Sequence, residues 1–310
     1  MTTAKTYRAT GINLKGSPLG EADLLLTILT AEHGLLRAVA PGARKPKSKI
    51  GGRTGLFVVN QLSLGRGRSL DRIHQAEVIA SYPRLSEDLG KLTAGQYLAE
   101  MALHQALSDQ PQVELFGALT GAIAAVEAVE AVNVAGGGAE RAAAVMAALS
   151  RGIYGLLAIA GVTPQLFDCA LSQVPLLPPD ALGDRDRWRV GFSAAAGGVV
   201  SLEALAQVDG RALLAAHPAI APAAWSRDRS RGQSGPAPPS APPPLPGQLM
   251  PLRLDAMELA ALRSLVQPEE PPPFSLATWV RVERSLRHYT QYHFGKPIRS
   301  AALLDTYVRC

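Results

Sequence analysis

Short apolar segments, separated by glycine and proline, fill residues 6–82 and limit what this part of the chain can form. The five predicted strands lie near Tyr7–Leu14, Leu24–Leu29, Leu35–Ala40, Leu56–Leu64 and Leu70–Tyr82. Five short strands in about 75 residues predict a small closed β-barrel such as the OB fold. An SH3-like barrel would give nearly the same pattern, and Leu24–Leu29 alone could also form a helical turn.

The periodicity changes after Pro83, where apolar residues begin to recur at three- and four-residue steps. This spacing is typical of one face of a helix. The three apolar stripes are Leu98, Met101, Ala102 and Ala106; Leu115, Leu119, Ile123 and Val126; and Val145, Leu149, Ile153, Leu156 and Leu157. Gly161 and Pro164 end the last helix. The predicted fold class is α+β multidomain, with a five-stranded OB-fold β-barrel followed by an α-helical bundle domain that has an irregular insert.

The second half of the chain alternates between irregular and helical segments. Weak β signals occur around Trp188–Phe192 and Gly198–Leu202, whereas Leu254–Val266 and Ser275–Phe294 have helical patterns. Between them, seven of the eleven residues from Pro236 to Pro246 are proline, a composition that cannot bury enough apolar surface to fold. The expected domains are 1–82 (barrel), 83–164 (helical), 165–226 (irregular insert), 227–247 (flexible linker) and 248–310 (helices that complete the helical domain).

Basic residues are concentrated in the first part of the chain. Residues 1–90 contain 13 Lys or Arg and 7 Asp or Glu, whereas the remaining residues contain 18 and 19. The overall charge of +5 therefore originates in the predicted barrel. A one-sided positive charge indicates a polyanionic partner, namely DNA, RNA or an anionic membrane. A solvated surface that keeps the protein soluble would give the same totals.

The densest run of positive charge extends from Arg37 to Arg72, where Asp71 is the single acidic residue. Pro46 and the neighbouring glycines place Arg44–Arg53 in a loop. A long basic loop on a small barrel can follow a phosphate backbone, so we expect a DNA-binding site here. Its candidate residues are Arg37, Arg44, Lys45, Lys47, Lys49, Arg53, Arg66, Arg68 and Arg72.

Two aromatic residues, Phe57 and Tyr82, lie near this segment in the sequence. Either ring could stack on a base. For Phe57 the pattern favours a position in the core.

A second group of basic residues lies near the end of the sequence. Its members are Arg281, Arg284, Arg287, Lys296 and Arg299, with His288 beside them. Two interpretations remain open: an amphipathic helix that covers a helical bundle, or a secondary contact with DNA or a partner protein.

No motif of a catalytic class is present. Gly42–Ser48 resembles a phosphate-binding P-loop, but Pro46 replaces the glycine that must precede the lysine. No HExxH or GxSxG motif and no catalytic constellation of paired carboxylates appears. We therefore expect a protein that is not an enzyme and has no cofactor.

The sequence also lacks membrane and secretion signals. The most apolar stretch, Gly117–Val134, carries Glu127 and Glu130, and Met1–Tyr7 has no apolar signal region. The two cysteines, Cys169 and Cys310, have no neighbours at metal or redox spacing. These features predict a cytoplasmic protein with reduced thiols, associated with the nucleoid if DNA is its ligand.

Three groups of residues resemble the bacterial recombination mediator family RecO, in matching order and spacing. The first is Leu19-Gly-Glu21-Ala-Asp23, Leu29-Thr30, Gly34, Pro41-Gly-Ala-Arg44-Lys45, Ser48, Phe57 and Glu77; the second is Gly161-Val-Thr-Pro164-Gln-Leu with Cys169; the third is Tyr292-His-Phe-Gly-Lys296-Pro-Ile-Arg299-Ser300 with Leu303-Leu304. The resemblance covers most of the chain outside residues 205–250.

The resemblance implies an OB fold followed by a helical domain and no catalytic residues. It implies binding of single- and double-stranded DNA and annealing of complementary strands. It also implies that the protein acts together with RecR, and often with RecF. It further implies contact with the tail of single-strand binding protein and assistance in loading RecA.

The central segment departs from the family pattern. Many relatives carry four zinc-binding cysteines there, whereas this chain has Cys169, Ser172, Ser201 and Ala204 at the matching positions. One thiolate cannot form a tetrahedral structural zinc site, so we expect no zinc.

Two other function classes remain open from the sequence. An RNA-associated OB-fold scaffold would use the same basic loop, and competition between RNA and single-stranded DNA would distinguish it. A nuclease would need clustered carboxylates or metal ligands, which the sequence lacks, and a cleavage assay with magnesium and manganese would test it.

Overall fold

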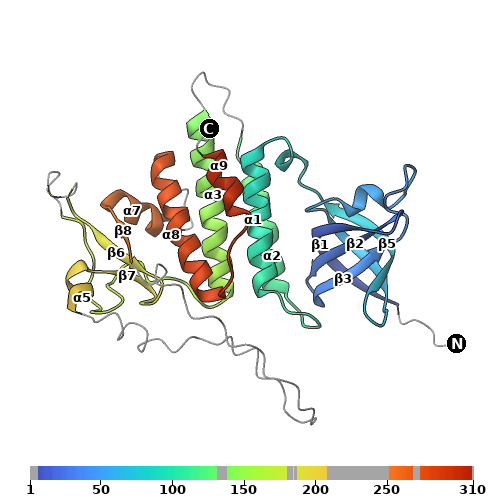
Figure 1. The fold of residues 1–310 in the computed structure, drawn as a ribbon, viewed down its shortest axis with the longest axis horizontal. Helices are drawn as coiled ribbons and strands as arrows, with labels where there is room; N and C mark the ends of the chain where they lie inside the picture. The colour runs from blue at the N-terminus through green and yellow to red at the C-terminus, as the bar shows by residue number, and fades with distance from the viewer. Residues whose placement is uncertain are drawn as a thin grey trace, which may run out of the picture. The chain divides into compact units, whose positions relative to one another are not determined.

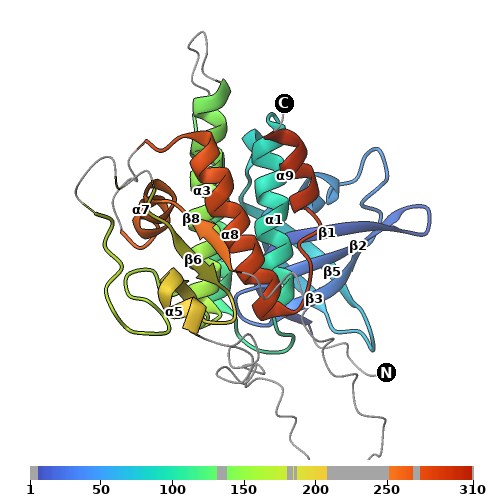
Figure 2. The same cartoon turned by 60° about the vertical axis from the view of Figure 1, so that its left-hand side comes forward.

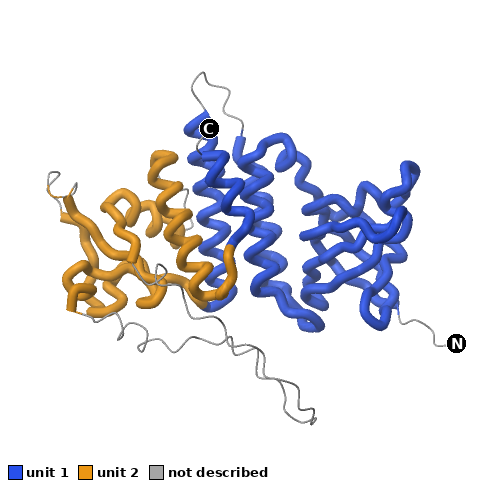
Figure 3. Tube along the Cα trace, in the orientation of Figure 1, with its two compact units in different colours: residues 1–161, 298–310 blue, residues 162–297 orange. Residues whose placement is uncertain are grey.

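The structure is a computed structural model that describes residues 6–130, 138–179, 184, 187–207, 251–267 and 273–308. The chain divides into two compact units, residues 1–161 with 298–310 and residues 162–297 (Figure 3). The five-segment division made from the sequence stays a prediction, and its linker, 227–247, lies outside the described residues.

Five strands of the first unit form a closed barrel (Figure 1). They are β1 (Thr6–Leu19), β2 (Asp23–Thr30), β3 (Gly34–Ala40), β4 (Val59–Gly65) and β5 (Asp71–Ala80). The strand order is β1-β2-β3-β5-β4, in which β1 pairs with both β2 and β4 and β3 pairs in parallel with β5. This is the OB topology, which confirms the predicted fold and excludes the SH3-like alternative. Leu24–Leu29 belongs to β2, so the helical turn considered for it is wrong.

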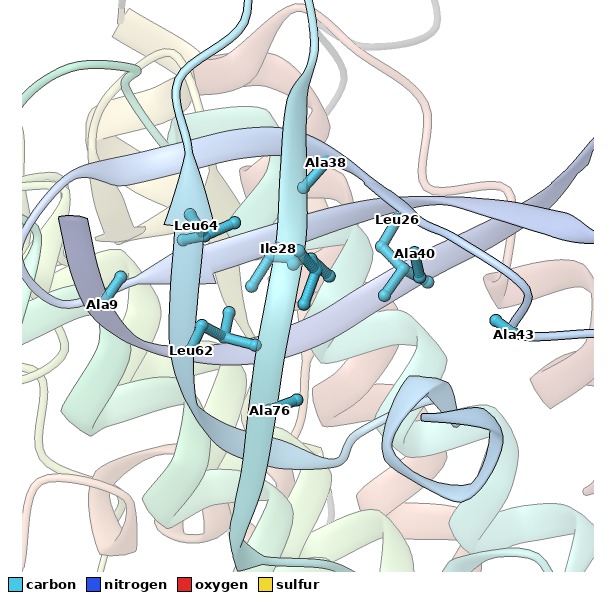
Figure 4. Packing of buried hydrophobic residues seen from close by; sticks show 10 residues of the cluster. Ala9, Leu26, Ile28, Ala38, Ala40, Ala43, Leu62, Leu64 and Ala76 are labelled. Carbon is cyan, nitrogen blue, oxygen red and sulfur yellow. The ribbon is translucent and has the colours of Figure 1, made fainter. Parts of the chain in front are cut away.

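Alanine, leucine and isoleucine side chains fill the interior of the barrel. The core cluster is Ala9, Leu26, Ile28, Ala38, Ala40, Ala43, Leu62, Leu64, Ile73 and Ala76 (Figure 4). Every second residue of β2 and β3 faces this interior, as expected for strands. The end of β2 is also buried on its outer side, at Leu29. Half of the cluster is alanine because facing strands of a five-stranded barrel leave little room between them.

Two strand boundaries differ from the prediction. β1 continues through Gly16 and Pro18 to Leu19, because its second half pairs with β2 up to the hairpin turn. β4 begins at Val59 rather than Leu56, because Phe57 has a φ of 61° and leaves the extended conformation.

The predicted apolar stripes are the buried faces of three helices in the first unit. A short 3-10 turn, η2 (Pro83–Leu85), precedes α1 (Leu89–Gln105), α2 (Val113–Ala128) and α3 (Gly138–Ile159). In the described part of the chain, α3 is long and apolar enough to cross a membrane, but more than half of it is buried within the protein. Core helices have the same length and composition, so α3 is weak evidence for a membrane span.

The barrel and the helices are joined through the β2–β3 turn. The Leu35 N–H donates to the carbonyl of Leu107 (2.8 Å), and the Gln112 N–H donates to that of Ala31 (2.8 Å). Gly34 lies between them with a φ of 67°, and a Cβ there would come within 2.1 Å of the Leu107 oxygen. Glycine is therefore required where the loop between α1 and α2 meets the barrel.

The last helix, α9 (Ala301–Tyr307), which the sequence analysis missed, lies along α1 (Figure 2). The Glu100 carboxylate of α1 accepts hydrogen bonds from the backbone N–H groups of Arg299 and Ser300 (both 2.9 Å) and from the Ser300 hydroxyl (2.7 Å). A carboxylate at the beginning of a helix satisfies its free N–H groups. Glu100 therefore attaches residues 298–308 to the first unit.

The described residues of the second unit form a three-stranded antiparallel sheet and three helices. The sheet has the order β7-β6-β8, and the elements are β6 (Val190–Ser193), β7 (Gly198–Val200), α5 (Leu202–Gln207), β8 (Leu252–Leu254), α7 (Ala256–Ser264) and α8 (Leu276–Phe294). The two weak β signals are confirmed as β6 and β7, and both predicted helices are present. Leu254 belongs to β8 instead of the helix, because Asp255 begins α7 with a capping box to Glu258.

We expect Glu100→Ala to lower the free energy of unfolding by about 1–2 kcal/mol, because three hydrogen bonds to a carboxylate are lost. Burial alone would raise the pKa of Glu100, but the hydrogen bonds from Ser300 and Arg299 outweigh it and hold the pKa below its usual 4.5. The stabilisation is therefore full above that value and is lost as the pH falls through the lower pKa of the folded protein. Urea unfolding at neutral and acidic pH measures both effects.

Gln96→Ala, one turn earlier on α1, is the matched control and should show no such pH dependence. If the difference in the free energy of unfolding between the wild type and Glu100→Ala stays constant from neutral to acidic pH, the role given to the carboxylate is wrong.

Candidate nucleic-acid interface

The predicted basic loop connects β3 to β4 and is fastened to the β1–β2 turn. The Asp23 carboxylate accepts a hydrogen bond from the Gly42 N–H (2.7 Å), and the Arg44 N–H donates to the Ala22 carbonyl (2.9 Å). The Arg44 guanidinium donates to the carbonyls of Gly20 (3.1 Å) and Glu21 (3.3 Å). The two loops are therefore held together at one end of the barrel.

Two buried asparagines hold the far part of the loop, where a 3-10 turn, η1 (Gly51–Thr54), leads toward β4. The Asn13 amide donates to the carbonyls of Arg53 (2.8 Å) and Gly55 (3.0 Å), and the Asn60 amide donates to the Arg53 carbonyl (2.9 Å). Both asparagines are only 1% exposed. The barrel wall thus fixes the backbone of the loop while its cationic side chains extend outward.

Eight of the nine predicted DNA-binding residues are exposed. They are Arg37, Arg44, Lys45, Lys47, Lys49, Arg66, Arg68 and Arg72. The ninth, Arg53, is partly buried and donates to the carbonyl of Lys49 within its own loop. No acidic residue lies between Pro41 and Thr54, so the positive charge of this loop is not balanced within it.

Strand register places further positive charge on one outer face of the barrel. Lys15 of β1 pairs with Thr27 of β2, which pairs with Arg37 of β3. On the next outward row, Val39 of β3 pairs with Arg72 of β5. Residues paired across neighbouring strands point to the same side of a sheet. We call Lys15, Arg37 and Arg72, with the basic loop and the β4–β5 loop, the basic face.

Lys15 is exposed and was missed by the sequence analysis. It lies alone between apolar and small residues, and only the pairing of β1 with β2 brings it beside Arg37. If Leu14–Ser17 had been predicted as a strand, the alternation of side chains along it would have placed Lys15 on the outer face.

The outer face formed by the first half of β1 with β4 and β5 has a different character. Arg8 pairs with Ser63, which pairs with Gln75, and Thr10 pairs with Gln61, which pairs with Glu77. These side chains are polar, and one cation is matched by one carboxylate. The excess of positive over negative charge therefore lies on the basic face.

The β4–β5 loop carries Arg66 and Arg68 at the other edge of the basic face. The Arg66 guanidinium lies 5.4 Å from the centre of the Tyr7 ring, a cation–π distance. The Tyr7 hydroxyl donates to the Asp71 carboxylate. Burial, and to a smaller extent this hydrogen bond, raise the pKa of Tyr7. Asp71 also accepts from the Gly67 N–H (3.0 Å), so the single acidic residue of the segment supports the turn.

Of the two aromatic residues near the basic loop, Phe57 is buried and Tyr82 is half-buried. Phe57 is 2% exposed and its ring lies against Gly95 of α1, which agrees with the core position favoured for it. The Tyr82 hydroxyl donates to the Thr120 carbonyl of α2 (3.5 Å), and burial raises the pKa of Tyr82.

The second predicted basic cluster is partly used within the protein. Arg281 donates to Glu258 (3.0 Å) and to the Arg253 carbonyl (3.0 Å), and Arg287 forms two hydrogen bonds with Glu283 (2.9 and 2.6 Å). Arg284, Lys296 and Arg299 are exposed. Lys296 and Arg299 belong to different compact units, and the secondary contact stays a prediction.

The position that resembles a zinc site holds a buried thiol surrounded by hydrogen-bond donors. The Ser201 N–H donates to the Cys169 sulfur (3.2 Å), and the backbone around Cys169 forms a tight turn to Val174 (2.8 Å). Burial raises the pKa of Cys169, but hydrogen bonds from Ser172 and Ser201 outweigh it and lower the pKa to about 7. In the described residues, no group of three His, Cys, Asp or Glu residues could hold a metal ion.

The topology and the charge distribution define an OB-fold protein with a one-sided basic face, joined to helices. Residues 1–82 match the family model for the N-terminal part of recombination protein O, and residues 86–206 match that for its C-terminal part. The chain belongs to the RecO family of DNA repair and recombination proteins, which confirms the resemblance found in the sequence.

Similar proteins cover almost the whole chain. The DNA repair protein RecO of Nostoc sp. is 45% identical over 310 residues, which covers 98% of this chain and 96% of the relative. That of Acaryochloris marina is 45% identical with 98% and 95% coverage, and that of Synechococcus elongatus is 37% identical with 98% and 96% coverage.

We expect purified protein to contain far less than one zinc per chain, and EDTA to leave its melting temperature unchanged, because one thiolate cannot hold zinc tetrahedrally. Cys169→Ala should lower the free energy of unfolding by about 2 kcal/mol, since it leaves the Ser201 N–H without its acceptor. Cys169→Ser keeps an acceptor for the Ser201 N–H and should lower the free energy of unfolding by less. Stoichiometric zinc, or a lower melting temperature in EDTA, would contradict this prediction.

Proposed function

We propose that this protein is a non-enzymatic, DNA-binding mediator of recombinational repair that binds single- and double-stranded DNA and anneals complementary strands. The observation that carries the proposal is the basic face: cations from three strands and two loops on one side of an OB barrel, in a chain of the RecO family. The fixed loop backbone supports it, because cations on an anchored loop meet phosphates without ordering the loop first.

The proposed mechanism is electrostatic. Lysine and arginine side chains that neutralise phosphates release condensed counterions, which drives binding without reading sequence. Two DNA strands repel each other, and a protein that lowers the charge of one strand reduces this repulsion. Annealing then becomes faster because the complementary strands meet more often.

The partners we propose follow from the family. RecR, and in some settings RecF, would join the protein on DNA, the tail of single-strand binding protein would recruit it, and RecA loading would follow. A cytoplasmic, nucleoid-associated location would accompany DNA binding. The exposed residues Arg284, Lys296 and Arg299 remain candidates for a secondary contact with DNA or a partner.

We expect the affinity for single-stranded DNA to fall with a log–log salt slope of about −3.5, if about five phosphates are contacted. The double variant Lys45→Glu, Lys47→Glu should weaken binding equally on unrelated sequences and make the slope shallower, because phosphate contacts do not depend on bases. Fluorescence anisotropy over a salt series measures both. A wild-type slope near zero would rule out the basic loop as a phosphate-binding element.

Strand annealing tests the function directly, and the barrel offers a matched pair of variants. Lys15 and Arg8 are both exposed on β1, but Lys15 lies on the basic face and Arg8 on the polar face. Lys15→Glu should slow the annealing of two complementary oligonucleotides several-fold, whereas Arg8→Glu, with almost the same change in total charge, should have little effect. Equal slowing by both variants would show that net charge matters and the basic face does not.

A further inference from the structure

The rings of the barrel are all occupied by contacts within the protein. Residues 6–82 contain Tyr7, Phe57 and Tyr82 as their Phe, Tyr and Trp residues. Phe57 is buried under α1, and Tyr82 is held against α2. Phe57 is therefore buried, and the two tyrosines are half-buried and held by contacts within the protein.

Tyr7 is the ring nearest the basic face, and it is enclosed. It packs against the barrel core, His33 meets it edge to face with centres 4.8 Å apart, and the Arg66 guanidinium covers it at 5.4 Å. Its hydroxyl is bound to Asp71. A base would have to displace Arg66, which is itself a candidate phosphate contact, to reach this ring.

The remaining outward residues of the basic face do not offer a surface for bases. The rows contain the cations Lys15, Arg37 and Arg72 with Thr27, and the partly buried Leu25 and Val39. Single-stranded DNA proteins that bind through bases use successive aromatic rings as platforms. Here the cations offer phosphates strong contacts, while the aliphatic side chains offer bases little.

From this arrangement we infer that the barrel holds a DNA strand by its phosphates alone and leaves the bases exposed to solvent, ready to pair. This inference rests on the proposed function and deepens it, because it defines the group that is recognised as the phosphodiester backbone, whatever the bases. A strand bound in this way can receive its complement while still attached to the protein. Binding and annealing then become compatible activities of one surface.

Two measurements on the full-length protein test the inference. The first compares the affinity for a thymine oligonucleotide of about 16 nucleotides with that for an abasic oligomer of equal length and phosphate number. We expect the two dissociation constants to agree within about twofold, whereas loss of one stacked base would weaken binding about fivefold or more. The second is permanganate oxidation of the thymines, which should be as fast in the saturated complex as in the free strand.

If the bases turn out to be bound, variants of two exposed rings can identify the ring that binds them. His74 is exposed on β5 against Gly65, and Phe167 of the second unit is 46% exposed, with the Arg263 guanidinium 5.3 Å from the centre of its ring. If thymines are protected, or the abasic oligomer binds more than about fivefold less tightly, the inference is wrong. His74→Ala and Phe167→Ala then show which ring stacks on the bases.

The outcomes separate the inference from the function on which it rests. Protection of thymines together with a steep salt dependence would overturn the exposed-base arrangement and leave binding by the basic face intact. Failure of both oligomers to bind at low salt would overturn both the proposed function and this inference.

Discussion

Strand β1 pairs along its length with two different neighbours, and the barrel depends on this shared pairing. Gly11 and Ile12 form backbone pairs with β2 on one side and β4 on the other. Because β1 pairs with β4 through its first half and with β2 through its second half, the sheet closes into a narrow barrel. Alanines fill much of its interior. Closure also fixes which residues point outward, so Lys15 and Arg37 are placed on one face by hydrogen bonds of the backbone.

The basic loop is held in place without neutralisation of its charges, because two of its anchors are neutral amides that donate hydrogen bonds to its carbonyl groups. The basic loop has five cations and no carboxylate between Pro41 and Thr54. Its backbone is held instead by Asn13 and Asn60 and by one carboxylate from outside, Asp23. Amide anchors do not neutralise the side chains, so the positive potential toward solvent is kept. A loop fastened by ion pairs would lose that potential.

The sequence predicts those elements whose signals are local. Glycine and proline punctuation marks the five strands, and the stripe Leu115–Val126 marks α2, because apolar periodicity and turn residues act over a few positions. β8 has only three residues and exists because Val190–Phe192, far away in the chain, supplies its pairing partners. Likewise, α9 has seven residues and needs Glu100 to begin it. Short elements of this kind depend on partners that no local pattern reveals.

Charge alone located the site only in part, because the fold decides which cations stay exposed. Ion pairs that consume cations lie outside the barrel, at Arg141–Asp88, Arg281–Glu258 and Arg287–Glu283. A count of basic residues treats Arg281 and Arg37 alike, although one is bound to a carboxylate and the other is exposed on a strand. Conversely, Lys15 contributes little to any local charge density, yet the register adds it to the basic face. Where a polyanion would bind therefore depends on which cations the fold leaves without internal partners, and that is a property of the strand pairing.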